Sequence, residues 1–416
     1  MSRARYLLLP ALLAANAAVW AVALALGPGP LPPERVFAEF CSTSAVVLMS
    51  ANALISTRPH VLDRWFGGLD KLFVAHRFNG IAVALVITAH FVVIPKAPIG
   101  LPLQVLPITN ATLLLTSIAL AIAPRSPWRR LVPLRYSRWH LEHRFMGVFL
   151  GLAVLHSLLV HPLVLGLPVL RVWVYGVATI GLAAYAFRET LETRLKQRHR
   201  YQVSAVSHPG AGELEVCLEP VTAPLSHRSG QFAFVRFEGG PSAEAHPFTI
   251  SRSPAEGRLR FSIKSSGDYT AALQTHLAEG SLARVEGPYG CFDHRLAGRR
   301  HLWLAGGIGV TPFLAFLGDL DVESDVRFVW SVREPAEATY AEEIRVAAAR
   351  LGNVRFEVHA SKSSGHLELV DLKLGDVGDL WVFVCGPVAM RNAFLKQLDA
   401  LGVSRRRVYY EEFSLR

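Results

Sequence analysis

The chain has 416 residues, of which 51% are hydrophobic and only 18% charged, with a mean hydropathy of +0.31. Since a soluble globular domain carries about 25% charged residues, this composition excludes a disordered or wholly soluble chain. The net charge of +10 lies in the apolar half: residues 1–190 hold 16 Lys and Arg against 6 Asp and Glu, and residues 191–416 hold 27 of each kind. A nucleic-acid binder would place its basic excess on a soluble domain, so no nucleic-acid partner is expected.

Six apolar segments in the first half are long enough to cross a bilayer of about 30 Å. They cover residues 6–27, 35–56, 72–94, 103–123, 145–164 and 169–187. The first is too long for a signal peptide and lacks a small-residue cleavage site, so it is expected to remain as a helix. The sequence therefore predicts a membrane α-helical bundle of six helices over residues 1–190.

Basic residues gather in alternate connections of this bundle. They are Arg3, Arg5, Arg58, Arg64, Lys71, Arg125, Arg129, Arg130, Arg135, Arg138, Arg188, Arg194, Lys196, Arg198 and Arg200. The intervening loops contain only Arg35, Lys96 and Arg171. By the positive-inside rule, we expect a multi-pass protein of the cytoplasmic (inner) membrane, surrounded by lipid, with both termini in the cytoplasm.

Four histidines form two spaced pairs on two of the predicted helices. His76 and His90 are 14 residues apart in the third, and His143 and His156 are 13 apart in the fifth. At 1.5 Å per residue these separations are roughly 21 and 20 Å. Both helices run outward, so His76 lies level with His143, and His90 level with His156. This geometry predicts two b haems stacked across the membrane, each iron held by one imidazole from each helix.

The second spacing requires a local irregularity. Each residue of an α-helix turns about 100° around the helix axis. After 14 residues the side chain points within about 40° of its starting direction, so His76 and His90 share a helix face. After 13 residues the two directions differ by about 140°. The fifth helix therefore needs a bulge to direct both of its histidines inward. The alternative is that the four are helix-packing or transport histidines. His140, one turn before His143, is a rival ligand, but His143 gives the better-matched spacing.

Neighbouring residues are suited to the same cofactor. Arg77 and Arg144 directly follow His76 and His143, where haem propionates would need cationic partners. The alternative for both is ordinary snorkelling at the cytoplasmic edge. Phe149 lies about midway between the two histidines of its helix, where it could separate two macrocycles; the alternative is a phenylalanine that faces lipid or packs between helices.

A different pattern begins after a charged connector at residues 188–200. Short alternating runs at 202–206, 213–218 and 232–237, separated by Gly, Pro and Ser, are typical of strands. They predict a small β-barrel domain over residues 198–296. Next come a strand at His301–Ala305, a glycine loop, a helix at Pro312–Leu320 and a strand at Val326–Val332. This order predicts an α/β nucleotide-binding domain over residues 297–416.

Two motifs of the last domain are candidate ligand loops. LAGGIGVTPFLAFL (304–317) places glycines between an apolar strand and a helix, where a backbone can approach a pyrophosphate and the helix N-terminus favours an anion. A plain tight turn is the alternative. WVFVCGPVAM (381–390) is a second buried strand that ends in Cys-Gly-Pro, at the carboxyl edge where such sheets bind ligands.

Six motifs in order carry a family resemblance. They are HPFTIS (246–251), IKSSGDYT (263–270), EGPYG (286–290), the glycine loop, CGP (385–387) and YEEF (410–413). The set resembles the ferredoxin-reductase flavoprotein module. Joined to six helices with histidines at 14 and 13 spacing, it resembles the NADPH oxidase and ferric reductase superfamily over roughly residues 35–416, here as a prokaryotic transmembrane flavocytochrome b. The barrel would then bind FAD and the α/β domain NAD(P)H.

The resemblance implies roles for individual residues. FAD would be held by His246, Pro247, Phe248, Thr249, Lys264, Gly267 and Thr270. The nicotinamide nucleotide would be bound by Gly306, Gly307, Gly309, Thr311, Arg333, Cys385, Gly386 and Pro387. Phe413, Thr249 and Cys385 would surround the reacting rings, with Phe413 covering the flavin. Arg333 would bind the 2′-phosphate of NADPH, or else form a surface salt bridge with Glu334 or Glu337.

The function implied is a transmembrane NAD(P)H oxidase. NADPH, or NADH, would supply electrons through FAD and two b haems to oxygen outside the membrane, giving superoxide. Two departures bear on the acceptor: three residues follow Phe413, and Ile94 stands where the oxidases carry another histidine. His161 and Lys96 are the other polar groups near the outer haem. The alternatives are a ferric-chelate reductase, an electron donor to a periplasmic protein, and a permease with a nucleotide-sensing domain.

Overall fold

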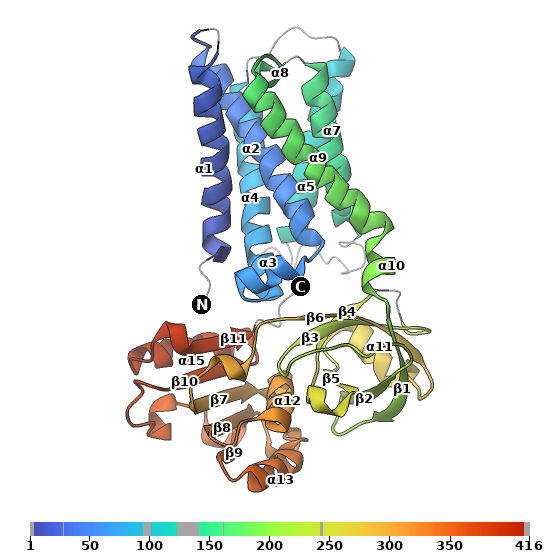
Figure 1. The fold of residues 1–416 in the computed structure, drawn as a ribbon, viewed down its shortest axis with the longest axis vertical. Helices are drawn as coiled ribbons and strands as arrows, with labels where there is room; N and C mark the ends of the chain where they lie inside the picture. Colours follow the sequence, from blue (N-terminus) through green and yellow to red (C-terminus); the bar gives the residue numbers. More distant parts are fainter. Residues whose placement is uncertain are drawn as a thin grey trace. The chain divides into compact units, whose positions relative to one another are not determined.

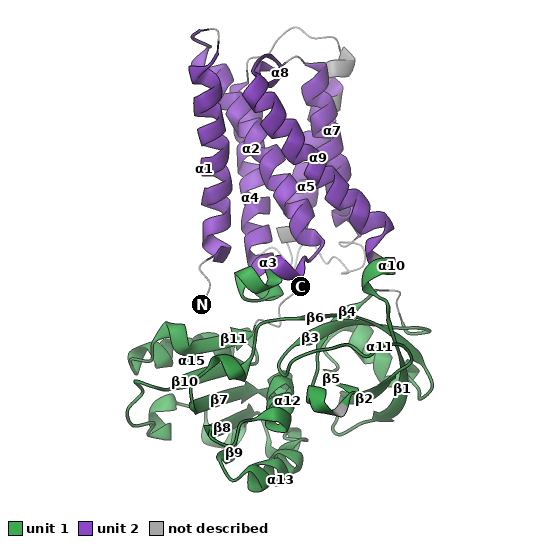
Figure 2. Ribbon diagram, viewed as in Figure 1, with its two compact units in different colours: residues 1–2, 63–71, 193–416 green, residues 3–62, 72–192 purple. Residues whose placement is uncertain are grey.

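The computed structural model describes residues 4–27, 29–94, 101–122, 141–160, 162–241 and 244–411. The chain forms two compact units, shown in different colours in Figure 2. The helical unit comprises residues 3–62 and 72–192, and the sheet unit comprises residues 1–2, 63–71 and 193–416. Residues 63–71 thus belong with the sheets, although the sequence predicts them as a loop of the membrane bundle.

The helical unit contains long apolar helices at the predicted positions (Figure 1). They are α1 (Ala4–Ala25), α2 (Pro33–Ser56), α4 (Leu69–Val93), α5 (Leu101–Ile122), α7 (Met146–Leu159) and α9 (Pro168–Thr190). The short helices α3 (His60–Phe66), α8 (Leu163–Gly166) and α10 (Glu192–Lys196) lie beside them in the chain. Among the described residues α1, α2, α4 and α9 are long and apolar enough to cross a membrane. The 14 residues of α7 are fewer than the roughly 17 that a span needs.

Apolar side chains from several helices meet in the centre of this unit. Buried members include Trp20, Leu48, Leu114, Leu150 and Leu170. A buried polar network accompanies them, since Asn16 donates to Thr43 Oγ1 (3.1 Å) and accepts from Trp173 Nε1 (3.0 Å). Because an unsatisfied amide is costly in an apolar interior, these bonds make α1, α2 and α9 mutually dependent.

The first part of the sheet unit is an antiparallel barrel. Its strands are β1 (His199–Ser207), β2 (Glu213–Pro220), β3 (Phe232–Phe237), β4 (His246–Thr249), β5 (Leu259–Lys264) and β6 (Leu282–Tyr289), with helix α11 (Asp268–His276) after β5. The strand order is β4-β3-β6-β1-β2-β5, and a bridge between Ile250 and Phe261 nearly closes the sheet. Buried residues alternate along β1, as at Tyr201 and Val203, which is the period-2 pattern that predicted the strands.

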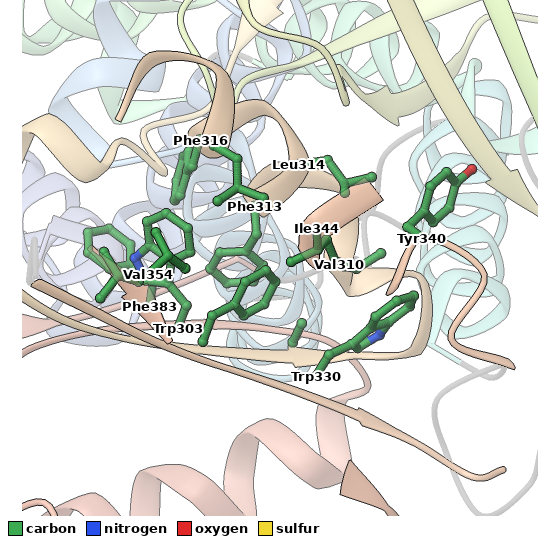
Figure 3. Close-up of a cluster of buried hydrophobic side chains, with 14 of the residues drawn as sticks. Trp303, Val310, Phe313, Leu314, Phe316, Trp330, Tyr340, Ile344, Val354 and Phe383 are labelled. Atoms are coloured by element: carbon green, nitrogen blue, oxygen red, sulfur yellow. The ribbon is translucent and has the colours of Figure 1, made fainter. Parts of the chain in front are cut away.

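The second part is a parallel five-stranded sheet with helices. Its strands are β7 (Arg300–Gly306), β8 (Asp325–Val332), β9 (Val354–Ala360), β10 (Trp381–Cys385) and β11 (Val408–Glu411), in the order β11-β10-β7-β8-β9. Its helices are α12 (Thr311–Asp319), α13 (Ala341–Leu351), α14 (Ser361–Ser364) and α15 (Val388–Ala400). Figure 3 shows Trp303, Phe313, Phe316 and Phe383 interlocked in its core. The predicted barrel followed by an α/β domain is confirmed.

Candidate cofactor sites

The glycine loop and the Cys-Gly-Pro turn lie against each other at the carboxyl edge of the parallel sheet. β7 and β10 are parallel neighbours, with Ala305 opposite Cys385, so the loops that follow them meet. A Cβ on Gly309 would overlap the carbonyl group of Cys385, and one on Gly386 would lie 3.0 Å from Gly306 Cα. The structure therefore brings both predicted nucleotide motifs together, and only glycine allows this backbone approach.

The glycine loop leads directly into a helix N-terminus. Gly307 has a φ of +50°, which favours glycine, and its carbonyl accepts a hydrogen bond from Trp330 Nε1 at 2.9 Å. Thr311 is buried at the start of α12 and donates to the Ile308 carbonyl at 3.1 Å. Amide groups at such a terminus suit a phosphate group, while the Thr311 hydroxyl is engaged in shaping the loop.

Cys385 is fully buried at the end of β10. Burial raises the pKa of its thiol well above the usual range, and the carboxyl of Glu411 adds to this effect. A thiol, not a thiolate, thus lies beside the turn, so Cys385 is suited to packing against a ring rather than to nucleophilic attack. Phe413, predicted to cover the flavin, lies outside the described residues.

The HPFT motif forms strand β4 on the barrel, paired with β3. Thr249 is 6% exposed, and its hydroxyl is buried without a hydrogen-bond partner among the described residues. A buried hydroxyl without a partner is costly, so this atom is suited to bonding a ligand such as a flavin. His246 instead stacks on Tyr269 of α11, with ring centres 3.5 Å apart, and it therefore joins β4 to that helix.

The other residues predicted to hold FAD, which the family resemblance assigns to its pyrophosphate, surround the start of α11. Thr270 Oγ1 accepts from the amides of Ser266 (2.9 Å) and Gly267 (3.1 Å). Its hydroxyl thus caps the helix, so Thr270 shapes this loop rather than offering a free donor to phosphate. Lys264, at the end of β5, has no ion pair in the described part of the chain, and its ammonium group is available to an anionic ligand.

Arg333 follows β8 and is exposed. Glu334, the neighbour that could neutralise it, is paired with Lys362 at 2.5 Å. Within the described ranges Arg333 forms no ion pair. The salt-bridge alternative is therefore not what this structure shows, and the guanidinium remains available at the carboxyl edge of the sheet.

In the helical unit, His76 faces His143 as the level spacing predicts. Their ring centres are 5.9 Å apart. Two imidazoles that bind one metal ion from opposite sides, at about 2 Å each, have ring centres roughly 6 Å apart. Gly80, one turn after His76, has room for a Cβ, whose nearest neighbour would be Asn52 Nδ2 at an ordinary contact distance of 3.9 Å. The distance between these two rings would thus allow both imidazoles to bind one metal ion.

The second pair shows a feature of ligating histidines. His90 Nδ1 lies 2.8 Å from the carbonyl oxygen of Ala38, an arrangement that fixes the ring and leaves Nε2 for a metal. His156 interacts electrostatically with His90. The regular α-helical hydrogen bonding between His143 and His156 is interrupted at Arg144 and Phe145, whose amides bond to the carbonyl groups three residues earlier, before α7 begins. This break lies where the 13-residue spacing requires an irregularity.

The charges beside the inner pair differ from those predicted. Arg144 is paired with Glu189, with Nε to Oε2 at 2.9 Å, so it is not a free partner for a propionate. The charged side chains that act on His76 include Arg77 and Arg188. Arg188, which the sequence presents only as part of the connector, is therefore a further candidate. Phe149 is buried in the helical core, which agrees with the packing alternative and not with a lipid-facing side chain. His140, His161 and Lys96 lie outside the described residues.

Sequence reasoning also missed an ionic cluster in the sheet unit. Asp63, Asp70, Lys71 and Glu411 are all buried there. Lys71 appears in the sequence only as one basic loop residue among several, because nothing local indicates that it contacts a strand 339 residues away.

Comparisons with known proteins agree with the geometry of the sheet unit. Residues 200–293 match a family model described as an FAD-binding domain. The reductase component of propane 2-monooxygenase from Mycolicibacterium smegmatis is 26% identical over 238 residues, covering 52% of this chain and 67% of that protein. A flavohemoprotein from Vibrio cholerae is 26% identical over 207 residues, covering 46% of this chain and 52% of that protein.

Residues 200–293 form an FAD-binding domain of the ferredoxin-reductase type. Among solved structures, flavohemoglobin from Malassezia yamatoensis with bound FAD and heme covers 92% of this chain and 96% of that chain, with 18% identity and a TM-score of 0.53. At this identity the likeness concerns the fold alone. The relatives are reductase components and a flavohemoprotein, which supports an oxidoreductase that uses FAD with NAD(P)H as electron donor.

A fragment of residues 198–416 is expected to bind FAD and to be reduced by NADPH without haem. The apolar cores of the barrel and of the parallel sheet lie within this range, so the fragment keeps these cores, although it lacks residues 63–71, which group with the same unit. Flavin absorbance and its bleaching by NADPH under anaerobic conditions measure this. A folded fragment without flavin would contradict the assignment of the HPFTIS strand.

Proposed function

We propose that this chain is a transmembrane flavocytochrome b that moves electrons from cytosolic NADPH through FAD and two b haems to oxygen outside the membrane, giving superoxide. The observation that carries the proposal is the pair His76 and His143 in the helical unit, whose ring centres are 5.9 Å apart. The same chain also has an FAD-binding domain. We place the protein in the cytoplasmic membrane with both termini inside, on the basis of its apolar helices and basic loops.

When bound, FAD would accept a hydride and release single electrons, and the haems would carry those electrons across the membrane. The residues of this chain supply binding and positioning. Thr249 offers its hydroxyl and Phe248 its ring on β4, while Gly309 and Gly386 let the glycine loop and the Cys-Gly-Pro turn approach each other at the edge where the nucleotide would bind. His76 with His143, and His90 with His156, would hold the two irons.

Oxygen uptake by purified protein tests this proposal. NADPH should drive oxygen consumption and superoxide formation that is sensitive to superoxide dismutase, with the visible spectrum of b haem. Ferric chelates are then added to the same preparation. Rapid chelate reduction with slow oxygen uptake would assign a ferric reductase instead, and slow transfer to both would indicate a protein acceptor. A preparation without haem would contradict the flavocytochrome altogether.

Arg333→Ala is expected to weaken NADPH specifically. A guanidinium can bind a 2′-phosphate with charge-assisted hydrogen bonds, whereas NADH offers only hydroxyl groups there. One such bond contributes about 1.5–3 kcal/mol, so the Michaelis constant for NADPH should rise roughly tenfold or more, at about 1.4 kcal/mol per decade. The constant for NADH should barely change.

The matched control for that variant is Arg355→Ala. Arg355 lies on β9 and pairs with Asp325 at the amino end of the same sheet, away from the nucleotide edge. It should leave both cofactors unaffected. Equal weakening of NADPH and NADH by Arg333→Ala would show that Arg333 serves the shared part of the nucleotide.

A further inference from the structure

A short segment between α2 and the body of α4 is built into the sheet unit. Residues 63–71 group with the sheets rather than with the helices on either side. Asp63 Oδ2 accepts a hydrogen bond from the Gly290 amide at 3.3 Å, and Lys71 Nζ donates to the Tyr410 carbonyl at 3.4 Å. Asp63, Lys71 and Gly290 are buried, so these contacts are part of the interior of the unit.

Both contacts fall where the barrel meets the carboxyl edge of the parallel sheet. Gly290 ends the EGPYG motif, and Tyr410 precedes Glu411 at the end of β11. Glu411 lies opposite Cys385 in the register of β10 and β11. Its Oε1 is 3.4 Å from the position of a Cβ on Gly290. The segment therefore contacts the place where the FAD-binding domain adjoins the Cys-Gly-Pro turn.

The buried ionic cluster of Asp63, Asp70, Lys71 and Glu411 contains more carboxyl groups than ammonium groups. Asp63, Asp70 and Glu411 contribute three carboxyl groups, and Lys71 is the cation that pairs with Asp70 at 3.2 Å. Lys71 also lies over the Tyr410 ring at 5.5 Å, and Arg391 lies 5.2 Å from the same ring. Glu411 Oε2 is buried and has no hydrogen-bond partner in the described part of the chain.

The protonation of this cluster follows from burial and from its own charges. Burial first, and then Asp70 and Asp63, raise the pKa of Glu411 from 4.5 to about 8, while Lys71 lowers it. Burial also raises the pKa of Asp63 from 3.8 to about 6. Among the described residues, the Cys385 thiol opposite Glu411 is a further titratable group, and burial raises its pKa well above its usual value. Glu411 is therefore protonated at neutral pH.

We propose that Asp70 and Lys71 are positioning residues for the nicotinamide site: they hold the end of β11, with the Glu411 carboxyl, against Gly290 and Cys385. This rests on the proposed function, since it takes that edge to be where NADPH meets the flavin. Lys71 orients β11 through the Tyr410 carbonyl and ring. Asp70 holds Lys71 in place through their ion pair. The negative charge of Asp70 also disfavours a second negative charge on Glu411, so Glu411 keeps its proton.

Opposite charge changes at two adjacent positions test the proposal in the full-length protein. The rate of flavin reduction by NADPH is followed anaerobically across the neutral pH range. Lys71→Met should move the inflection assigned to Glu411 upward, and Asp70→Asn should move it downward, each by about one pH unit. Glu411→Gln should abolish the inflection. Lys71→Arg, which keeps the positive charge, should leave the pH profile as it is in the wild type.

Thermal unfolding as a function of pH gives a second readout that needs no NADPH. Glu411 binds its proton more tightly in the folded state than in the unfolded state, so the free energy of unfolding should fall as pH rises from 4.5 to about 8. Glu411→Gln should remove this dependence. In Asp70→Asn the fall in the free energy of unfolding should end at a lower pH than in the wild type. In Lys71→Met it should continue to a higher pH.

Each outcome decides the proposal. Shifts in the same direction, or no shift, in Lys71→Met and Asp70→Asn would overturn it, because a purely structural loss lowers the rate equally at every pH. If Lys71→Met does not fold, the two single variants Asp70→Asn and Glu411→Gln still test the proposal. Asp70→Asn should move the inflection downward, and Glu411→Gln should abolish it. A wild-type protein that binds FAD but is not reduced by NADPH would contradict the proposed function, while the unfolding profiles would still test the coupling.

Discussion

Replacement of His90 or His156 by alanine is expected to remove about half of the haem absorbance and to stop electron transfer across the membrane, while flavin reduction by NADPH continues. In the proposed arrangement each iron would be held by two imidazoles, so loss of one ligand of the outer pair should release that haem and leave the inner one. The contact of His90 Nδ1 with the Ala38 carbonyl oxygen adds to the effect, because a preoriented ring binds metal more tightly. Haem content by the pyridine haemochrome spectrum, together with anaerobic flavin bleaching, measures both halves of this result.

The rival ligand supplies the control. His140→Ala should keep full haem content, whereas His143→Ala should lose the inner haem, because the structure places His143 beside His76. Full haem content in His90→Ala or His156→Ala would remove those residues from the ligand set. If only His140→Ala lost haem, His140 and not His143 would be the second ligand of the inner haem.

Gly309→Ala is expected to slow reduction by NADPH strongly while FAD stays bound. A Cβ at this position would overlap the Cys385 carbonyl group and lie 2.8 Å from Gly386 Cα. Both obstacles are backbone atoms, so the two loops must separate, and the helix N-terminus then moves away from the pyrophosphate. The barrel that would hold FAD has its own core, and flavin absorbance should persist. We expect a loss of at least tenfold in the rate of flavin reduction at limiting NADPH, equivalent to about 1.4 kcal/mol.

Gly352→Ala is the matched control for that variant. Gly352 ends α13 with a φ of +73°, and a Cβ at this position would meet no atom within 4 Å. Alanine there should cost about 1 kcal/mol of stability through backbone strain and leave reduction by NADPH unchanged. If Gly309→Ala and Gly352→Ala behave alike, the contact between the two loops has no special role in nucleotide binding.

Local patterns were sufficient for the elements and their order. The alternation at 202–206 and 232–237 became β1 and β3, and the strand, glycine loop and helix around residues 301–320 lie where the pattern predicted them. Such features depend on side-chain periodicity and on the backbone freedom of glycine, both of which are local properties. The 13-residue histidine spacing likewise indicated that a helix must be irregular, and the break at residues 144 and 145 lies between the two histidines.

The partners of individual polar side chains were decided by tertiary structure. Arg144 binds Glu189, 45 residues away, instead of remaining free for a propionate, and His246 stacks on Tyr269 instead of remaining available to a ligand. Thr270 could have bonded phosphate or capped its helix, and the turn of the chain before α11 selects the cap. The sequence shows a donor and a charge in each case, but the choice of partner depends on which elements pack together.

By itself the sequence determined where this chain is apolar, where it turns, and which residues have the chemistry to hold a flavin, a nucleotide and two irons. Only the tertiary structure decided that residues 63–71 leave the bundle and bury Asp63 and Lys71 against Gly290 and Tyr410. A charged loop is ordinarily solvated. Its burial is stabilised by partners more than 200 positions away in the chain, and no local pattern records such contacts, because their energy exists only once both parts have folded.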